Sequence, residues 1–151
     1  MSTFVQTLKK FPRLFWISNI IELFERWGWY AFYNGFIALY LTSPRESGAL
    51  GFSNVEKGTI MGTASMILYF LPVITGAVAD RVGYKKVLLL SFVTYILSFF
   101  MLGRFETFGA IFASFILLAV AGALFKPLIS GTVARVTDRE TASLGFGIFY
   151  M

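Results

Sequence analysis

The fold of this chain is decided by residues 14–41, which read LFWISNIIELFERWGWYAFYNGFIALYL. As a helix rising about 1.5 Å per residue, this run is about 42 Å long, more than the roughly 30 Å of a bilayer's hydrocarbon core. Three ionisable residues, Glu22, Glu25 and Arg26, lie near its middle. Each costs roughly 2.5–3.5 kcal/mol at the centre of a membrane helix, so we expect their side chains to face partners or water. The segment is therefore predicted to span a membrane and to carry a functional site.

The composition of the whole chain also indicates a membrane protein. Hydrophobic residues make up 57% of it and charged residues 14%, whereas soluble domains have about 45–50% and about 25%. The absence of Cys and His excludes disulfides and thiol-ligated metals, and leaves carboxylates as the groups for a proton relay. The net charge of +5 is spread over short loops, which argues against a nucleic-acid partner. With no catalytic residue set, metal site or cofactor loop in the sequence, we do not expect an enzyme.

The hydropathy pattern predicts an all-α membrane protein with four complete transmembrane helices and the start of a fifth. We place the helices at about 14–41, 54–79, 87–102 and 108–136, and the fifth from 142. The short polar connections indicate antiparallel neighbours. The last run, SLGFGIFYM, is too short to cross a bilayer, so we expect the chain to be a fragment of a longer protein.

Lysine and arginine residues are unequally divided between the two ends of these helices. The side that includes the N-terminus has eight, which are Lys9, Lys10, Arg13, Arg81, Lys85, Lys86, Arg135 and Arg139. The other side has three, which are Arg45, Lys57 and Arg104. Because positively charged loops stay in the cytoplasm, the N-terminus is predicted to be cytoplasmic, with the chain crossing the cell (inner or plasma) membrane several times.

Six side chains share one face of the first predicted helix. At 100° per residue they fall within an arc of about 140°, and they are Glu22, Glu25, Arg26, Trp29, Tyr30 and Tyr33. Glu22 and Arg26 are four residues apart, a spacing at which their charged groups can meet. One arginine neutralises only one carboxylate, so the other needs a proton or a second cation.

Lys126 is the candidate for that second cation. Lys126 and Glu22 each lie about 13 Å from the cytoplasmic end of their helices, so the two could face each other at one depth. Pro127 removes a helical hydrogen bond and loosens the backbone near Ala123. Two other interpretations stay open: the charges could form a structural ion-pair network between helices 1 and 4, and the aromatic residues could pack the core.

The connection between the second and third predicted helices has a distinctive spacing. It reads GAVADRVGYKK from Gly76 to Lys86. Gly76 lets another helix approach closely, and Gly83 permits a tight turn. Asp80 lies at a helix C-terminus, where the helix dipole disfavours an anion unless a cation answers it. The cations available nearby are Arg81, Lys85 and Lys86.

Three separated motifs resemble the proton-dependent oligopeptide transporter branch of the major facilitator superfamily. GAVADRVGYKK is similar to the superfamily loop motif G-x3-D-R-x-G-x-[RK]-[RK]. Glu22-x-x-Glu25-Arg26, followed by Trp27 and Tyr30, resembles the ExxERFxYY motif of the peptide branch. FKP at residues 125–127 resembles its FKPNIS segment, and GIFYM at 147–151 resembles the start of its fifth helix. Tyr69 and Pro72 also stand as in the second helix of that branch.

The resemblance implies that residues 1–151 are the N-terminal part of the first six-helix bundle of a transporter. Such a protein imports di- and tripeptides, or peptide-like solutes, by proton-coupled symport with alternating access. Its partners would be a small-molecule substrate, the lipid bilayer and a C-terminal six-helix bundle absent here. Protons would be the coupling ion, and no cofactor would be needed.

The resemblance also assigns roles to individual residues. Proton coupling falls to Glu22, Glu25, Arg26 and Lys126. Substrate binding falls to Arg26, Trp29, Tyr30, Tyr33, Tyr69 and Lys126. The cytoplasmic gate motif comprises Gly76, Asp80, Arg81, Gly83, Lys85 and Lys86.

Departures from the family pattern keep other functions open, among them Trp29 in place of a tyrosine and a loop, residues 80–83, of the general superfamily form. Tyr33 stands where the family usually has a second arginine on helix 1, and Leu128 stands where it has an asparagine. One alternative is a superfamily transporter of another small solute. The other is a non-transporting membrane scaffold, if the chain really ends at Met151.

Overall fold

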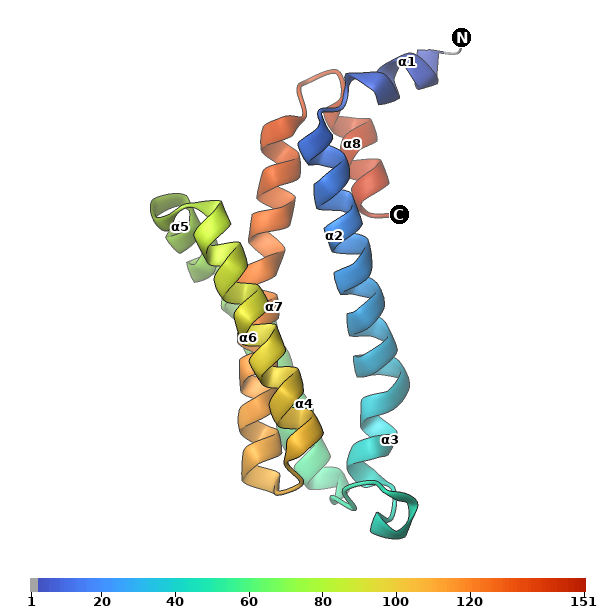
Figure 1. Cartoon of the computed structure of the whole chain (residues 1–151), viewed down its shortest axis with the longest axis vertical. Helices are drawn as coiled ribbons and strands as arrows, with labels where there is room; N and C mark the ends of the chain where they lie inside the picture. The colour runs from blue at the N-terminus through green and yellow to red at the C-terminus, as the bar shows by residue number, and fades with distance from the viewer. Residues whose placement is uncertain (1–2) are drawn as a thin grey trace. The chain divides into compact units, whose positions relative to one another are not determined.

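The computed structural model describes residues 3–151, and every regular element in this part of the chain is a helix (Figure 1). In chain order they are α1 (Thr3–Lys10), α2 (Arg13–Tyr30), the π-helix η1 (Ala31–Phe36), α3 (Ile37–Thr42), the 3-10 helix η2 (Arg45–Ser47), α4 (Asn54–Phe70), α5 (Pro72–Val82), α6 (Tyr84–Arg104), α7 (Phe108–Val136) and α8 (Ala142–Phe149). The predicted all-α fold is confirmed.

The described chain divides into two compact units. The first unit combines residues 3–30 with Ile129–Met151, and the second unit is the continuous stretch Ala31–Leu128. One division falls where α2 ends and η1 begins, and the other falls within α7, after Pro127.

The single α-helix expected over residues 14–41 is three helical segments in the structure. It consists of α2, the π-helical turn η1 and α3. In a π-helix the backbone bonds run from i to i+5, so the helical period changes over this segment. Asn34 and Gly35 lie within η1, and both are poor α-helix formers. A regular period of 100° per residue therefore holds only as far as Tyr30.

The helix expected over 54–79 also has a break. α4 and α5 meet at Leu71 with a bend of 47°. Pro72 begins α5 and has no N–H to continue the hydrogen-bond ladder of α4, which accounts for the break. α4 itself begins with a capping box, in which Ser53 and Glu56 satisfy each other's backbone N–H groups. α6 is longer than the expected 87–102, since it starts directly after Gly83, whose φ of +100° favours glycine.

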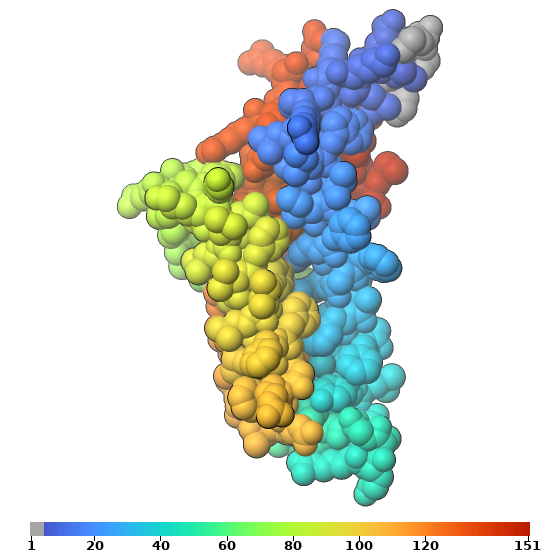
Figure 2. Space-filling view, viewed as in Figure 1, coloured from blue at the N-terminus to red at the C-terminus, as the bar shows by residue number. Residues whose placement is uncertain are grey.

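Two helices among the described residues, α6 and α7, are long and apolar enough to cross a membrane, and the bent pair α4–α5 is a third if it counts as one span. The expected count of four complete spans stays a prediction, because α2 carries Arg13 and the three ionisable residues near its centre. Figure 2 shows α6, in yellow and gold, on the surface of its unit. Its exposed apolar side chains suit contact with lipid; they are Leu89, Leu90, Val93, Ile96, Leu97 and Phe100.

Within the second unit, α7 is held by apolar packing and by hydroxyl groups. Ala79, Val87, Leu124 and Leu128 form one buried cluster. From α6, Ser91 donates a hydrogen bond of 2.8 Å to the carbonyl of Ala121, and Ser98 donates one of 2.9 Å to that of Ser114. These buried hydroxyls are satisfied by backbone carbonyls of the neighbouring helix, as membrane helices require.

The first unit has an aromatic core and a polar network beside it. The rings of Phe11 and Phe15 stack with centroids 4.1 Å apart and pack with Val133. α8 approaches this core at Gly145, where an added Cβ would lie 2.7 Å from Thr137 Cγ2. The packing of α8 therefore depends on a glycine at this position.

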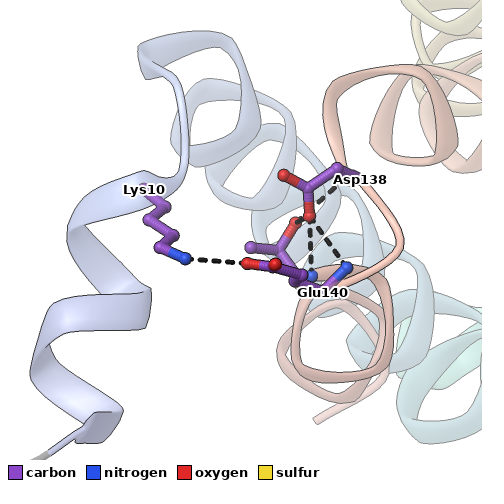
Figure 3. A network of polar contacts seen from close by, with 4 residues as sticks. Lys10, Asp138 and Glu140 are labelled. Carbon is purple, nitrogen blue, oxygen red and sulfur yellow. Dashed lines mark hydrogen bonds and ion pairs between the residues drawn. The ribbon is translucent and has the colours of Figure 1, made fainter.

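Figure 3 shows the polar network, with the amine of Lys10 directed at the carboxylate of Glu140, 2.9 Å away. The hydrogen bond to Glu140 raises the pKa of Lys10. In the adjoining turn, Asp138 Oδ1 accepts hydrogen bonds from the hydroxyl and backbone N–H of Thr141. These two bonds lower the pKa of Asp138. The network thus joins α1 to the loop before α8.

Candidate functional site

The three ionisable residues of α2 form a compact charged cluster, here called the carboxylate cluster (Glu22, Glu25 and Arg26). Arg26 Nε donates a hydrogen bond of 2.6 Å to Glu22 Oε1, and it lies 3.4 Å from Glu25 Oε2. The two carboxylate side chains are each 10% exposed, and that of Arg26 is 29% exposed. The helical spacing alone brings these groups together, because residues i and i+4 lie on one face.

The guanidinium of Arg26 contacts both carboxylates of the carboxylate cluster. Taken alone, the three groups carry one net negative charge when both carboxylates are ionised. The second oxygen of Glu22, Oε2, is buried, and it accepts no hydrogen bond from any residue in the described part of the chain. A buried acceptor without a donor is costly. This oxygen is therefore a position at which a further hydrogen-bond donor would be stabilised.

The aromatic residues expected beside this cluster do not share one element. Trp29 and Tyr30 lie in α2 near its C-terminal end, and Tyr30 is 54% exposed. Tyr33 lies in η1, where its hydroxyl donates to the carbonyl of Met61 at 3.1 Å and lies 2.9 Å from Ser65 Oγ. Trp29 and Tyr30 thus belong to the same helix as the carboxylate cluster, whereas Tyr33 connects η1 to α4.

Lys126 lies in α7 with its amine over an aromatic ring. The Nζ atom is 5.1 Å from the centroid of Tyr69, which is on α4 and 71% exposed. This distance is within the range of a cation–π interaction. Two of the six residues to which the resemblance assigned substrate binding are thus neighbours in the second unit. The expected meeting of Lys126 with Glu22 joins residues of different units and stays a prediction.

The hairpin motif lies at the junction of α5 and α6. Its charged members are exposed, with Asp80 and Arg81 in the last turn of α5 and Lys85 and Lys86 in the first turn of α6. Tyr84, between them, donates a hydrogen bond of 3.2 Å to Asp80 Oδ1.

Gly76, at the start of the motif, lies against α7. A Cβ added at Gly76 would lie 3.6 Å from Cβ of Pro127, which is ordinary van der Waals contact. The helix that was expected to approach closely at Gly76 is thus α7.

One buried polar contact beside this site has no counterpart in the sequence analysis. Thr75 is 6% exposed, and its hydroxyl donates a hydrogen bond of 2.7 Å to the carbonyl of Ala123. Pro127 gave the only signal, because a proline at that position leaves the carbonyl of Ala123 without its helical donor. The identity of the donor depends on how α5 and α7 align, which the sequence does not reveal.

Metal ligation was not expected from the sequence. Across residues 3–151, no group of three or more Asp and Glu side chains could hold a metal ion, and the sequence has no His or Cys.

Comparison with known proteins gives a family match over most of the chain. The sequence pattern of the family described as Major Facilitator Superfamily matches residues 15–151. No solved structure matches significantly.

Several curated relatives are permeases. The chain is 29% identical over 144 residues to dipeptide and tripeptide permease B of Aeromonas hydrophila, and 30% identical over 146 residues to dipeptide and tripeptide permease A of Klebsiella pneumoniae. It is 27% identical over 146 residues to dipeptide and tripeptide permease A of Escherichia coli. These matches cover 93–94% of this chain but 28% of each relative. The expected resemblance to peptide transporters is confirmed, as is the expectation of a multi-pass transporter family rather than an enzyme.

Proposed function

Because this chain belongs to the Major Facilitator Superfamily, we propose that it is the N-terminal part of a proton-coupled symporter that imports di- and tripeptides or peptide-like solutes. The names of the permeases it is similar to support peptide as the substrate class. The observation that carries the proposal is the carboxylate cluster, in which one guanidinium serves two nearly buried carboxylates. Such a cluster has a charge that one proton can balance.

Proton uptake by this cluster would control the availability of Arg26. With both carboxylates ionised, Arg26 is held by Glu22 at 2.6 Å and by Glu25 at 3.4 Å. A proton on either carboxylate weakens its hold on the guanidinium, which then becomes able to bind a substrate carboxylate. Lys126 would provide a second cation for the substrate, while Trp29 and Tyr30 would supply apolar and hydrogen-bonding surface. Proton binding and substrate binding are thereby coupled through one side chain.

The remaining parts of the proposal concern the membrane and the rest of the transporter. Substrate would bind near the middle of the membrane, between this helical bundle and a C-terminal six-helix bundle, and access would alternate between the two sides. The N-terminus would be cytoplasmic in a cell membrane, as the distribution of Lys and Arg predicts. The α5–α6 hairpin, with Asp80 and Arg81, would then lie at the cytoplasmic gate.

The test is uptake of a labelled dipeptide by the full-length protein in sealed vesicles. Glu25→Gln removes one ionisable group but keeps the shape of the side chain. It is expected to lower uptake driven by a proton gradient about tenfold or more, equivalent to about 1.4 kcal/mol, and to spare peptide exchange without a gradient. Glu106→Gln, at an exposed carboxylate between α6 and α7, is the matched control. Undiminished gradient-driven uptake in Glu25→Gln would refute the coupling role.

A second candidate is a transporter of another small solute, with the same proton coupling. It is favoured by Tyr33, a predicted substrate residue whose hydroxyl is bound to α4. Competition decides between the two, because an excess of unlabelled di- or tripeptide suppresses uptake of the true substrate only if peptides share its site. Proton-driven uptake of a non-peptide solute that peptides do not inhibit would favour this candidate.

A further inference from the structure

Pro127 leaves a gap in the backbone hydrogen bonds of α7. The helix continues through it from Phe108 to Val136. The proline nitrogen carries no hydrogen, so it cannot donate to the carbonyl of Ala123, four residues earlier. Ala123 is fully buried. A buried carbonyl in a membrane protein requires a donor, and its regular i+4 backbone donor is missing here.

Thr75 of α5 supplies that donor. Its hydroxyl is 2.7 Å from the carbonyl oxygen of Ala123 and 3.4 Å from that of Pro72 in its own helix. A hydroxyl has one hydrogen, and the shorter bond to Ala123 takes it. The next residue, Gly76, lets α5 lie against the Pro127 ring. Two neighbouring residues of α5 therefore meet α7 at Pro127: the Thr75 side chain at the carbonyl of Ala123, and Gly76 at the proline ring.

Lys126 lies next to these contacts along α7. It precedes Pro127 in the chain, and its amine lies 5.1 Å from the centre of the Tyr69 ring. Tyr69 is on α4, which connects through Leu71 to α5. One bent segment, α4–α5, thus holds the α7 backbone near Lys126 through Thr75 and the end of its side chain through Tyr69.

We propose that Thr75 is a positioning residue for Lys126: its hydroxyl fixes the α7 backbone at the Pro127 gap and so holds the lysine amine over Tyr69. This inference rests on the proposed function only for the importance of Lys126 in transport. Ser91 serves as a comparison for Thr75. Its hydroxyl also donates to a carbonyl of α7, that of Ala121. The residue four positions after Ala121 is Phe125, whose backbone N–H can serve that carbonyl. Loss of the Ser91 hydroxyl therefore leaves the carbonyl of Ala121 with its backbone donor.

The accessibility of the Lys126 amine can be measured by chemical labelling, without a transport assay. In the full-length protein in detergent, a limiting amount of acetic anhydride labels lysine amines, and mass spectrometry gives the rate at Lys126 relative to exposed Lys9. Thr75→Val keeps the shape of the side chain but removes the donor. It is expected to raise the relative rate at Lys126 about threefold to tenfold, the factor that one lost hydrogen bond represents. Thr75→Ser is expected to restore the wild-type rate, and Ser91→Ala to leave it unchanged.

A double-variant cycle separates positioning from general loosening of the bundle. Pro127→Ala returns an N–H to the backbone, which can satisfy Ala123 without Thr75. Thr75→Val is therefore expected to have little effect on labelling in the Pro127→Ala background. If Thr75→Val alone fails to fold, the combination with Pro127→Ala is expected to fold. An unchanged Lys126 rate in Thr75→Val, or the same increase with and without Pro127, overturns the proposal, as does a double variant that still fails to fold.

The two proposals fail separately. Absence of proton-driven peptide uptake in the wild-type protein refutes the transport function and leaves the labelling result as it is. If uptake occurs, Thr75→Val is expected to raise KM more than it lowers kcat, with recovery in Thr75→Ser, because a displaced lysine first weakens substrate binding. A normal KM beside an altered labelling rate would remove Lys126 from the substrate site and keep Thr75 as its positioning residue.

Discussion

Two cations of the helical bundle, Arg26 and Lys126, are stabilised in different ways. Arg26 contacts Glu22 and Glu25 of its own helix, within four residues along the chain. The amine of Lys126 lies over an aromatic ring of another helix, and its neighbouring backbone takes a hydroxyl donor from a third. The first arrangement exists wherever α2 is helical, whereas the second exists only when α4, α5 and α7 are packed together. The difference predicts which substitutions act locally and which act through packing.

The largest effect is expected from removing the local cation. Arg26→Gln leaves two nearly buried carboxylates without their shared guanidinium, and breaking a buried pair in this way costs about 3–5 kcal/mol. We expect a large fall in the melting temperature of the full-length protein in detergent. Adding Glu22→Gln and Glu25→Gln to Arg26→Gln is expected to recover most of the loss. If this triple variant is no more stable than Arg26→Gln, the carboxylate cluster is not the source of the cost.

A smaller effect is expected at a contact between elements. Tyr33→Phe removes the hydroxyl that joins η1 to Met61 and Ser65 of α4, which is expected to cost about 1 kcal/mol. Thermal unfolding measures the change. Tyr40→Phe is the matched control, since the Tyr40 ring stacks on Phe36 while its hydroxyl has no hydrogen bond within the described residues 3–151. Equal melting temperatures for the two variants would mean that the Tyr33 contact adds nothing to stability.

The aromatic partner of Lys126 provides a third test. Tyr69→Leu removes the ring beneath the amine, whereas Tyr69→Phe keeps it, so only the leucine variant is expected to lose the cation–π interaction, worth about 0.5–1 kcal/mol at an exposed site. Chemical labelling of Lys126 is expected to speed up in Tyr69→Leu and to stay at the wild-type rate in Tyr69→Phe. Identical labelling in both would show that the Tyr69 ring does not determine the position of the lysine.

The smallest effect is expected outside the membrane helices, at Asp138. Its pKa is lowered from the ordinary 3.8, first by the hydrogen bond from the Thr141 hydroxyl and then by that from its N–H. The charged form is therefore favoured in the folded protein, so its contribution to stability is present above pH 3.8 and is lost as the pH falls through the lowered pKa.

Hydrogen exchange of the Glu140 and Thr141 amides, corrected for the intrinsic pH dependence, measures this change. We expect protection to be lost at the acidic end of the range. In Asp138→Asn, protection is expected to be lower and independent of pH over the same interval. Equal acid sensitivity in the wild type and Asp138→Asn would assign the transition to another group.

The parts of the fold and site that were predicted from the sequence are those governed by local periodicity. The all-α class follows from long apolar runs, and the contact of Glu22 with Arg26 follows from their four-residue spacing. The break at Leu71 could be inferred from Pro72, although the expected helix ran through it.

The parts of the fold and site that were not predicted from the sequence depend on contacts between helices or on small changes of helical period. The π-helical turn places Tyr33 against α4, and although Asn34 and Gly35 weaken an α-helix there, they do not specify a π-helix. The hydroxyl of Thr75 reaches Ala123 because of how two helices align, which no spacing along one chain specifies. In this molecule, local pairs were predictable, and pairs between helices were not.

The contact of Lys10 with Glu140 has a consequence for the order in which the chain is built. These residues are 130 positions apart, so a ribosome has made all of Ala31–Leu128 before the second partner emerges. The second unit is one uninterrupted stretch, and its contacts can form during synthesis. The contacts of the first unit form later, because α1 and α2 can meet α8 only after the intervening helices have been synthesised. The ion pairs of Arg26 with Glu22 and Glu25 do not depend on this order, because all three residues lie within α2 and can pair as soon as that helix forms.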